Sequence, residues 1–90
     1  MPTVTVTHAG GSTYLITVDE GSSSTHHTVT VWPSDIDRYA PDSTPEALIA
    51  ASFEFLLERE PKESILATFE LPVIERYFAD YPAWIGGRLR

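Results

Sequence analysis

The sequence predicts an α+β domain in which a three-stranded antiparallel sheet is covered on one face by a layer of helices. Two observations support this fold class. The first third of the chain alternates apolar and polar residues, and the remainder changes to the spacing of amphipathic helices. Segments rich in glycine, serine or proline separate these stretches. At 90 residues, the chain is predicted to form one domain over residues 1–85, followed by a flexible tail over residues 86–90.

Three segments show the period-two alternation of half-buried strands: residues 3–8, 13–18 and 26–32. An odd-length loop between the first two keeps their apolar side chains on one face. A three-residue loop would place Val6 opposite Tyr14, and a five-residue loop keeps the same faces aligned. A two-residue turn would not. The opposite face is rich in threonine and is expected to face solvent. The outer strands carry little charge, which leaves their edges open to strand addition.

Four segments are predicted to form the helical layer: residues 34–39, 45–60, 61–68 and 72–79. Ser34 is expected to cap the first helix, with Asp37 completing a capping box. Thr44 is expected to cap the main helix, which Pro61 should end. Proline also favours the first turn of a helix, so Pro61 and Pro72 are expected to open the last two.

The main helix has an unusually wide apolar surface. At 100° per residue, its apolar residues and Ser52 cover roughly half of the circumference. We therefore expect this helix to lie between the sheet and the carboxy-terminal helices. Phe55 falls outside the apolar arc, and Glu54 and Glu58 mark the solvent side. These three residues form the predicted interaction surface.

The charge of the chain argues against several classes of partner. Thirteen Asp and Glu residues outnumber six Lys and Arg residues, which gives a formal net charge of −7. Nucleic acids and anionic membranes require basic surfaces, so neither is an expected partner. The chain has no cysteine, which excludes disulfides and thiolate chemistry. The first residues lack the features of a signal peptide, and no apolar run is long enough to span a bilayer, so a cytoplasmic protein is expected.

No pattern in the sequence predicts a catalytic, cofactor-binding or metal site. His26 and His27 are adjacent and point to opposite faces of a regular strand, so they cannot share a metal ion. His8 is expected at the far end of the sheet from His27. The serines lie in turns without a nucleophile elbow, and the glycines do not have the spacing of a phosphate loop. We therefore expect no catalytic residue, no cofactor and no metal, and the sequence favours a protein that is not an enzyme.

The second half of the chain resembles a family of small, uncharacterised bacterial proteins. The resemblance rests on "SFEFLLEREPKESIL" followed by "FELPVIERYF". The family is similar in having a short β-region that leads into these helical residues, and its end reads closer to "YFPEY" where this chain has "YFADY". The resemblance implies the α+β grouping only, because the family has no established activity.

The leading functional hypothesis is a small acidic protein-interaction module that binds a protein partner or forms a homodimer. It would act through an edge strand or through the helical surface near Phe55. One alternative is a ligand-binding or hydrolase-like protein with a pocket between the sheet and the helices. Another is an acidic inhibitor of a nucleic-acid-binding protein, in which carboxylates imitate phosphates.

Overall fold

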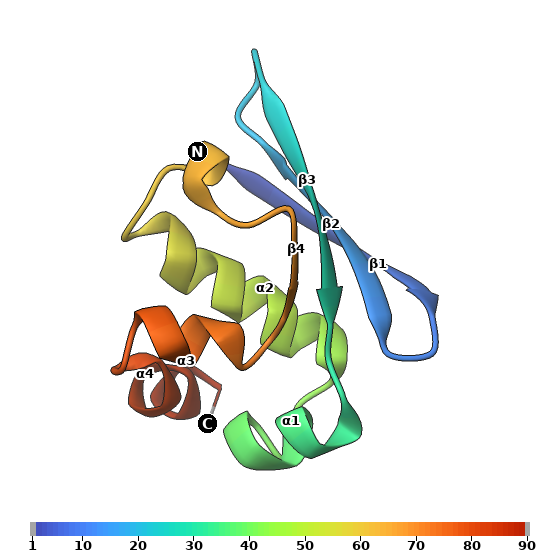
Figure 1. The fold of residues 1–90 in the computed structure, drawn as a ribbon, viewed down its shortest axis with the longest axis vertical. Coiled ribbons are helices and arrows are strands. Elements are labelled where there is room, and N and C mark those ends of the chain that lie inside the picture. The colour runs from blue at the N-terminus through green and yellow to red at the C-terminus, as the bar shows by residue number, and fades with distance from the viewer. Residues whose placement is uncertain (1, 90) are drawn as a thin grey trace.

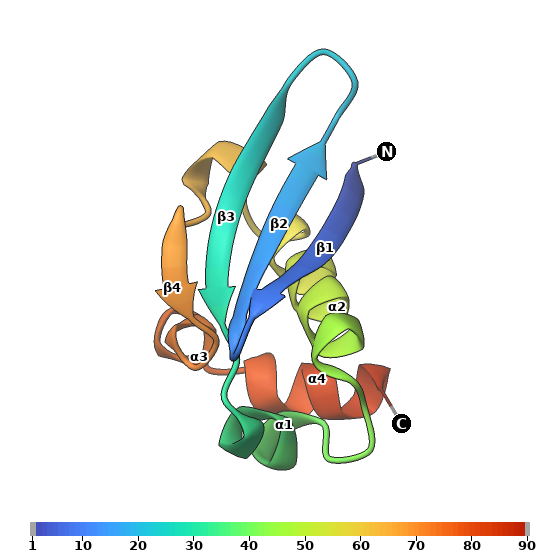
Figure 2. The ribbon, with the colours of Figure 1, turned by 90° about the vertical axis from the view of Figure 1, so that its right-hand side faces the viewer.

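The computed structural model describes residues 2–89 and confirms the α+β class. One four-stranded sheet has its strands in the order β1-β2-β3-β4, and the helices gather on one of its faces (Figures 1 and 2). The strands are β1 (Thr3–Gly10), β2 (Thr13–Asp19), β3 (Ser24–Thr30) and β4 (Thr68–Glu70). The helices are α1 (Pro33–Tyr39), α2 (Pro45–Leu57), α3 (Val73–Tyr77) and α4 (Tyr81–Arg88), with one 3₁₀ turn, η1 (Lys62–Ser64).

The first three strands form the predicted antiparallel meander. Val6 lies opposite Ile16, which is the register of the five-residue loop, so the pairing of Val6 with Tyr14 is wrong by two residues. A bulge between His8 and Gly10 precedes the turn, where Gly10 and Gly11 adopt φ of 116° and 56°. These angles lie in the region that glycine adopts without steric strain. The connection is thus a two-residue turn, Gly11–Ser12, preceded by a bulge, and not the predicted odd-length loop. The bulge supplies the extra residue, so the same face of each strand points to the core, as expected.

The inward face of the sheet is most deeply buried at its centre. Tyr14, Ile16, Val18 and Val29 are buried against the helices. On β1 the inward valines are only half-buried, because no strand covers the outer side of β1. Leu15 points to the opposite face and is 48% exposed.

The predicted three-stranded, purely antiparallel sheet is wrong in one respect, because β4 adds a fourth strand parallel to β3. The helix expected over residues 61–68 is replaced by η1 and an extended segment. The Thr28 N–H donates to the Ala67 carbonyl at 2.7 Å, and the Leu71 N–H donates to the Thr30 carbonyl at 3.0 Å. These bonds satisfy the edge of β3 while Phe69 enters the core, so pairing with β3 keeps the residues after η1 extended in place of the predicted helix.

The helix boundaries also differ from the predicted ones. The N-cap of α1 is Trp32, whose N–H donates to the Asp35 carboxylate at 2.8 Å, so the expected capping box starting at Ser34 is wrong. Pro33 occupies the first turn instead. Thr44 caps α2 as predicted, accepting from the Ala47 N–H at 3.1 Å. The regular part of α2 ends at Leu57 rather than at residue 60.

The two phenylalanines of α2 point to opposite layers. Phe53 packs against His27 of β3 and Phe69 of β4, with ring centroids 5.3 and 6.2 Å away. Phe55 packs against Tyr81 and Trp84 of α4, each at 5.2 Å. Helix α2 is therefore sandwiched between the sheet and the carboxy-terminal helices, as its wide apolar surface predicts.

Phe55 is fully buried, so the expectation that it faces a partner is wrong in this fold. The Arg59 guanidinium lies 3.6 Å from the centroid of its ring and closes its outer side. The cover comes mainly from α4, which extends through residues 86–88, where the sequence predicted a flexible tail. Residue 90 lies outside the described residues.

A buried chain of hydrogen bonds joins α4 to α2. The Ser52 hydroxyl donates to the Leu48 carbonyl at 2.6 Å, which leaves its oxygen to accept from the Tyr81 hydroxyl, also at 2.6 Å. Tyr81 and Ser52 have no exposed surface, and burial raises the pKa of the Tyr81 hydroxyl above its ordinary value. The pair places a polar link at the centre of an otherwise apolar interface, which fixes how α4 lies on α2.

Phe55→Ala is expected to destabilise the protein as strongly as Phe53→Ala. Both rings are fully buried, so each truncation leaves a cavity and costs about 3–5 kcal/mol. Tyr77→Ala serves as the control, because the Tyr77 side chain is 68% exposed and its loss should change stability by about 0.5 kcal/mol or less. Denaturant unfolding at several protein concentrations measures the three values. A Phe55→Ala protein as stable as the wild type would contradict the packing of α4.

Ser52→Ala and Tyr81→Phe should show strong coupling. Ser52→Ala leaves the buried Tyr81 hydroxyl without an acceptor, at a cost of about 1–3 kcal/mol. Tyr81→Phe should cost less, because the Ser52 hydroxyl loses its donor but still donates to the Leu48 carbonyl. The double variant removes both groups, so its loss should be smaller than the sum of the single losses. A double-mutant cycle by denaturant unfolding gives the coupling. Strictly additive losses would show that the two hydroxyls do not interact.

Candidate functional site

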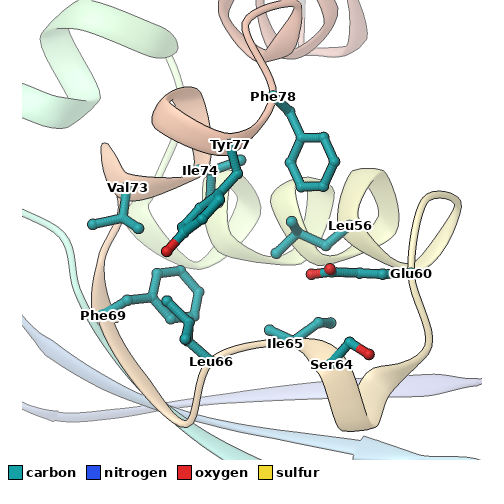
Figure 3. A pocket seen from close by; sticks show the side chains of 10 residues that line it. All are labelled: Leu56, Glu60, Ser64, Ile65, Leu66, Phe69, Val73, Ile74, Tyr77 and Phe78. Atoms are coloured by element: carbon teal, nitrogen blue, oxygen red, sulfur yellow. The ribbon is translucent and has the colours of Figure 1, made fainter.

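An apolar cleft of about 450 Å³ opens between the end of α2, the segment that carries η1, strand β4 and helix α3 (Figure 3). It is lined by Leu56, Glu60, Ser64, Ile65, Leu66, Phe69, Val73, Ile74, Tyr77 and Phe78. Eight of these ten side chains are aliphatic or aromatic. The cleft is therefore suited to an apolar group, and its few polar atoms must set any specificity.

The cleft has a buried floor and an exposed rim. Leu56, Ile65 and Ile74 belong to the hydrophobic core and form the floor. At the rim, Leu66 is 45% exposed and Tyr77 is 68% exposed. Figure 3 shows the Tyr77 and Leu66 side chains converging beside Phe69 at one side of the cleft. Large exposed apolar side chains beside a concave apolar surface are typical of binding sites.

Glu60 supplies the only ionisable side chain of the cleft apart from the Tyr77 phenol. Its carboxylate points toward the hollow in Figure 3. Within residues 2–89, no hydrogen bond or ion pair reaches this carboxylate, and its neighbours in sequence are engaged elsewhere. Arg59 binds Asp80 at 2.8 Å, and Lys62 binds Glu20 at 2.7 Å. Burial without a compensating cation raises the pKa of Glu60 above its ordinary value.

Two side chains fix the segment that forms one wall of the cleft. His27 of β3 donates from Nδ1 to the Leu66 carbonyl at 2.8 Å, and its Nε2 lies 2.9 Å from the Thr25 hydroxyl. Lys62 is buried, and its Nζ donates to carboxylates of Glu20 and Glu63, each at 2.7 Å. These bonds tie the wall to β3 and to the turn between β2 and β3. His27, which the sequence did not predict to bind a metal ion, holds the cleft wall in place.

The predicted interaction residues do not form one surface. Phe55 is in the core, Glu54 binds Arg88 of α4 at 3.1 Å, and Glu58 is exposed 3.9 Å from Arg59. Among residues 2–89, no group of three or more His, Asp or Glu side chains is arranged to hold a metal ion. No helix in that part of the chain is long and apolar enough to cross a bilayer.

The cleft has groups for recognition rather than an assembled acid–base pair. In the described chain, no hydrogen bond joins the Glu60 carboxylate to the hydroxyl of Ser64 or Tyr77. A nucleophile and its base must lie within hydrogen-bond reach. An apolar wall with one unpaired carboxylate instead matches a ligand group that combines an apolar chain with a positive charge. Sequence reasoning missed Glu60, although its spacing of four residues from Leu56 could have shown that the two share a helix face.

Glu60→Gln is expected to increase the stability of the protein at pH 7. Because the pKa of Glu60 is higher in the folded state than its ordinary 4.5, the folded protein binds this proton more tightly than the unfolded chain. The charged form therefore lowers stability above the folded pKa, and this loss disappears as pH falls below the unfolded pKa. Denaturant unfolding between pH 3 and pH 7 should show a gain for the variant that grows with pH across the titration of Glu60.

The matched control is Glu58→Gln, which removes an exposed carboxylate outside the cleft. We expect it to change stability by about 0.5 kcal/mol or less at pH 7. A loss of stability in the Glu60 variant at pH 7 would show that the carboxylate has a stabilising partner in solution.

Comparison with known proteins gives no relative from which a function could be transferred. No family model matches the chain, and neither a curated protein nor a solved structure does. The resemblance of the second half to a bacterial family thus stays an expectation. The cleft and the edges of the sheet are the features of this chain that bear on its function.

Proposed function

We propose that this protein is a small acidic protein-interaction module, and that its cleft receives an apolar side chain of the partner that lies beside a positive charge. The observation that carries the proposal is the Glu60 carboxylate, which faces an apolar hollow and has no partner among residues 2–89. This proposal keeps the interaction hypothesis and moves its site from Phe55 to the cleft.

The apolar part of the cleft supplies the binding free energy. Its volume of about 450 Å³ lies within the range of roughly 300–1,000 Å³ that is usual for ligand pockets. Tyr77 stands at the rim with most of its side chain in water. Aromatic residues at such positions commonly act as anchors of protein interfaces, because they bury a large area on binding with little loss of rotamer freedom.

The charge of the cleft supports a basic partner. A cation placed against Glu60 would compensate electrostatically for the hydration that the carboxylate loses on burial. The formal net charge of −7 attracts basic segments over a longer range and repels anionic ones. Specificity for a cation next to an apolar group therefore follows from one carboxylate and its surroundings.

The position of the cleft beside an edge strand supports a protein ligand. Ala67 and Leu71 use backbone groups to bind β3, so the alternation of a strand directs the backbone groups of Thr68 and Glu70 away from the sheet. Phe69, between them, lines the cleft. An extended partner segment can thus pair with β4 and place one side chain in the cleft, which combines backbone hydrogen bonds with side-chain selection.

Selection from a random peptide library displayed on phage tests this proposal. Wild-type protein should enrich sequences in which Lys or Arg adjoins a large apolar residue. Glu60→Gln protein should lose the preference for the basic residue and keep the preference for the apolar one. As a probe of the cleft itself, n-hexylammonium should shift the amide signals of the cleft residues in NMR spectra at about millimolar concentration, and more strongly than n-hexanol.

Tyr77→Ala is the companion variant, and it should weaken both kinds of binding without unfolding the protein. Glu58→Gln should bind as the wild type does. Equal enrichment of basic peptides by wild-type and Glu60→Gln protein would contradict the proposal, as would hexylammonium shifts that fall outside the cleft.

A further inference from the structure

The outer edge of β1 is free and carries no charge. The strand "TVTVTHAG" contains no Asp, Glu, Lys or Arg, although the chain as a whole has a formal charge of −7. Natural edge strands are usually protected by charged side chains, proline or a covering element. We propose that two copies of this chain pair antiparallel through β1, about a two-fold axis at Thr5. This inference goes beyond the proposed function, because it concerns the opposite edge of the sheet from β4.

The hydrogen-bond pattern of the sheet shows which backbone groups face the free edge. The Val31 N–H donates to the Ser12 carbonyl, so Thr13 and Thr30 form a non-hydrogen-bonded pair. Alternation along β2 then directs the backbone groups of Thr17 toward β1, where Thr17 pairs with Thr5. It follows that Thr5 bonds to β2, whereas the N–H and carbonyl groups of Val4 and Val6 point outward.

The sequence at this edge is its own antiparallel complement. Residues 3–7 read Thr-Val-Thr-Val-Thr, which is a palindrome. In a pair centred on Thr5, Val4 of one copy lies opposite Val6 of the other, and Thr3 lies opposite Thr7. The two Val4–Val6 pairs would exchange the outward backbone groups in four hydrogen bonds. Every residue of this segment would then meet an identical residue type across the axis, and threonine pairs of this kind stabilise antiparallel sheets.

The burial of β1 supports a missing neighbour. Val4 and Val6 point toward the helical side of the sheet and pack against the core, yet both remain half-buried, whereas Tyr14, Ile16 and Val18 on β2 and His27 and Val29 on β3 are buried. A second β1 would cover their open side. The absence of charge in β1 allows two copies to meet here despite the repulsion between their acidic surfaces. The resulting eight-stranded sheet would hold one cleft near each end.

Sedimentation velocity over a range of protein concentrations tests this pairing. Wild-type protein should pass from monomer to dimer, and added salt should strengthen the dimer by screening the net charge of its copies. Thr5→Lys places two positive charges directly opposite each other, where side chains of a non-hydrogen-bonded pair approach most closely. We expect its dissociation constant to rise about tenfold or more. Thr5→Glu should act in the same way.

An equimolar mixture of Thr5→Lys and Thr5→Glu proteins should form a heterodimer, because the opposite charges then face each other across the axis. Thr68→Lys is the matched control: it places the same charge on an exposed threonine of the other edge strand, and its dimer should equal that of the wild type. Unfolding curves of all variants verify that each is folded. A wild-type protein that stays monomeric up to about 1 mM overturns the proposal. So does a mixture that fails to associate, or a dimer that Thr68→Lys disrupts and Thr5→Lys does not.

Discussion

The apolar surface of α2 is too wide for the sheet alone to cover, and the rest of the structure follows from this constraint. Phe53 and Phe55 are two residues apart and therefore point about 200° from each other around the helix. The sheet buries the first ring, and only a second layer can bury the second. The chain that follows α2 must return across it, and α4 completes this task with the Tyr81 hydroxyl bound to Ser52.

The path of that return creates the cleft. Parallel strands need a long crossover connection, and α1 and α2 provide it between β3 and β4. The chain leaves the end of α2, reaches the edge of the sheet at β4 and then turns back into α3. The segment that carries η1 and β4 therefore lies between the end of α2 and helix α3 and keeps them apart. Lys62 and His27 hold this segment in place, so the hollow between α2 and α3 stays open instead of collapsing.

The elements that the sequence predicted correctly are those whose signals are local. Strands β1 to β3 follow from period-two alternation and glycine turns, and the start of α2 follows from Thr44 and Pro45. Strand β4 has three residues, too few to show an alternation, and its conformation depends on β3 about forty residues away. Pro61 favours a helix start and does precede the single 3₁₀ turn η1, but pairing with β3 keeps the following residues extended. The burial of Phe55 could not be predicted locally either. Helix α4 covers its ring, but Gly86 and Gly87 in that helix favour a flexible tail when the sequence is considered alone. The cleft could not be predicted, since its walls come from four separate segments.

The late position of α4 in the chain has a consequence during synthesis. The hairpins of β1 to β3 join near neighbours and can form early, because short loops close at low entropic cost. The Phe55 ring lacks its aromatic cover until Phe78, Tyr81 and Trp84 emerge from the ribosome, about 25 residues after α2 is complete. At the usual rate of about 5–20 residues per second, this interval lasts on the order of seconds. Throughout it, the nascent chain presents an uncovered aromatic surface of the kind that chaperones and aggregation both exploit. Arrival of the last helix, rather than collapse of the sheet, is therefore the event that ends this exposure.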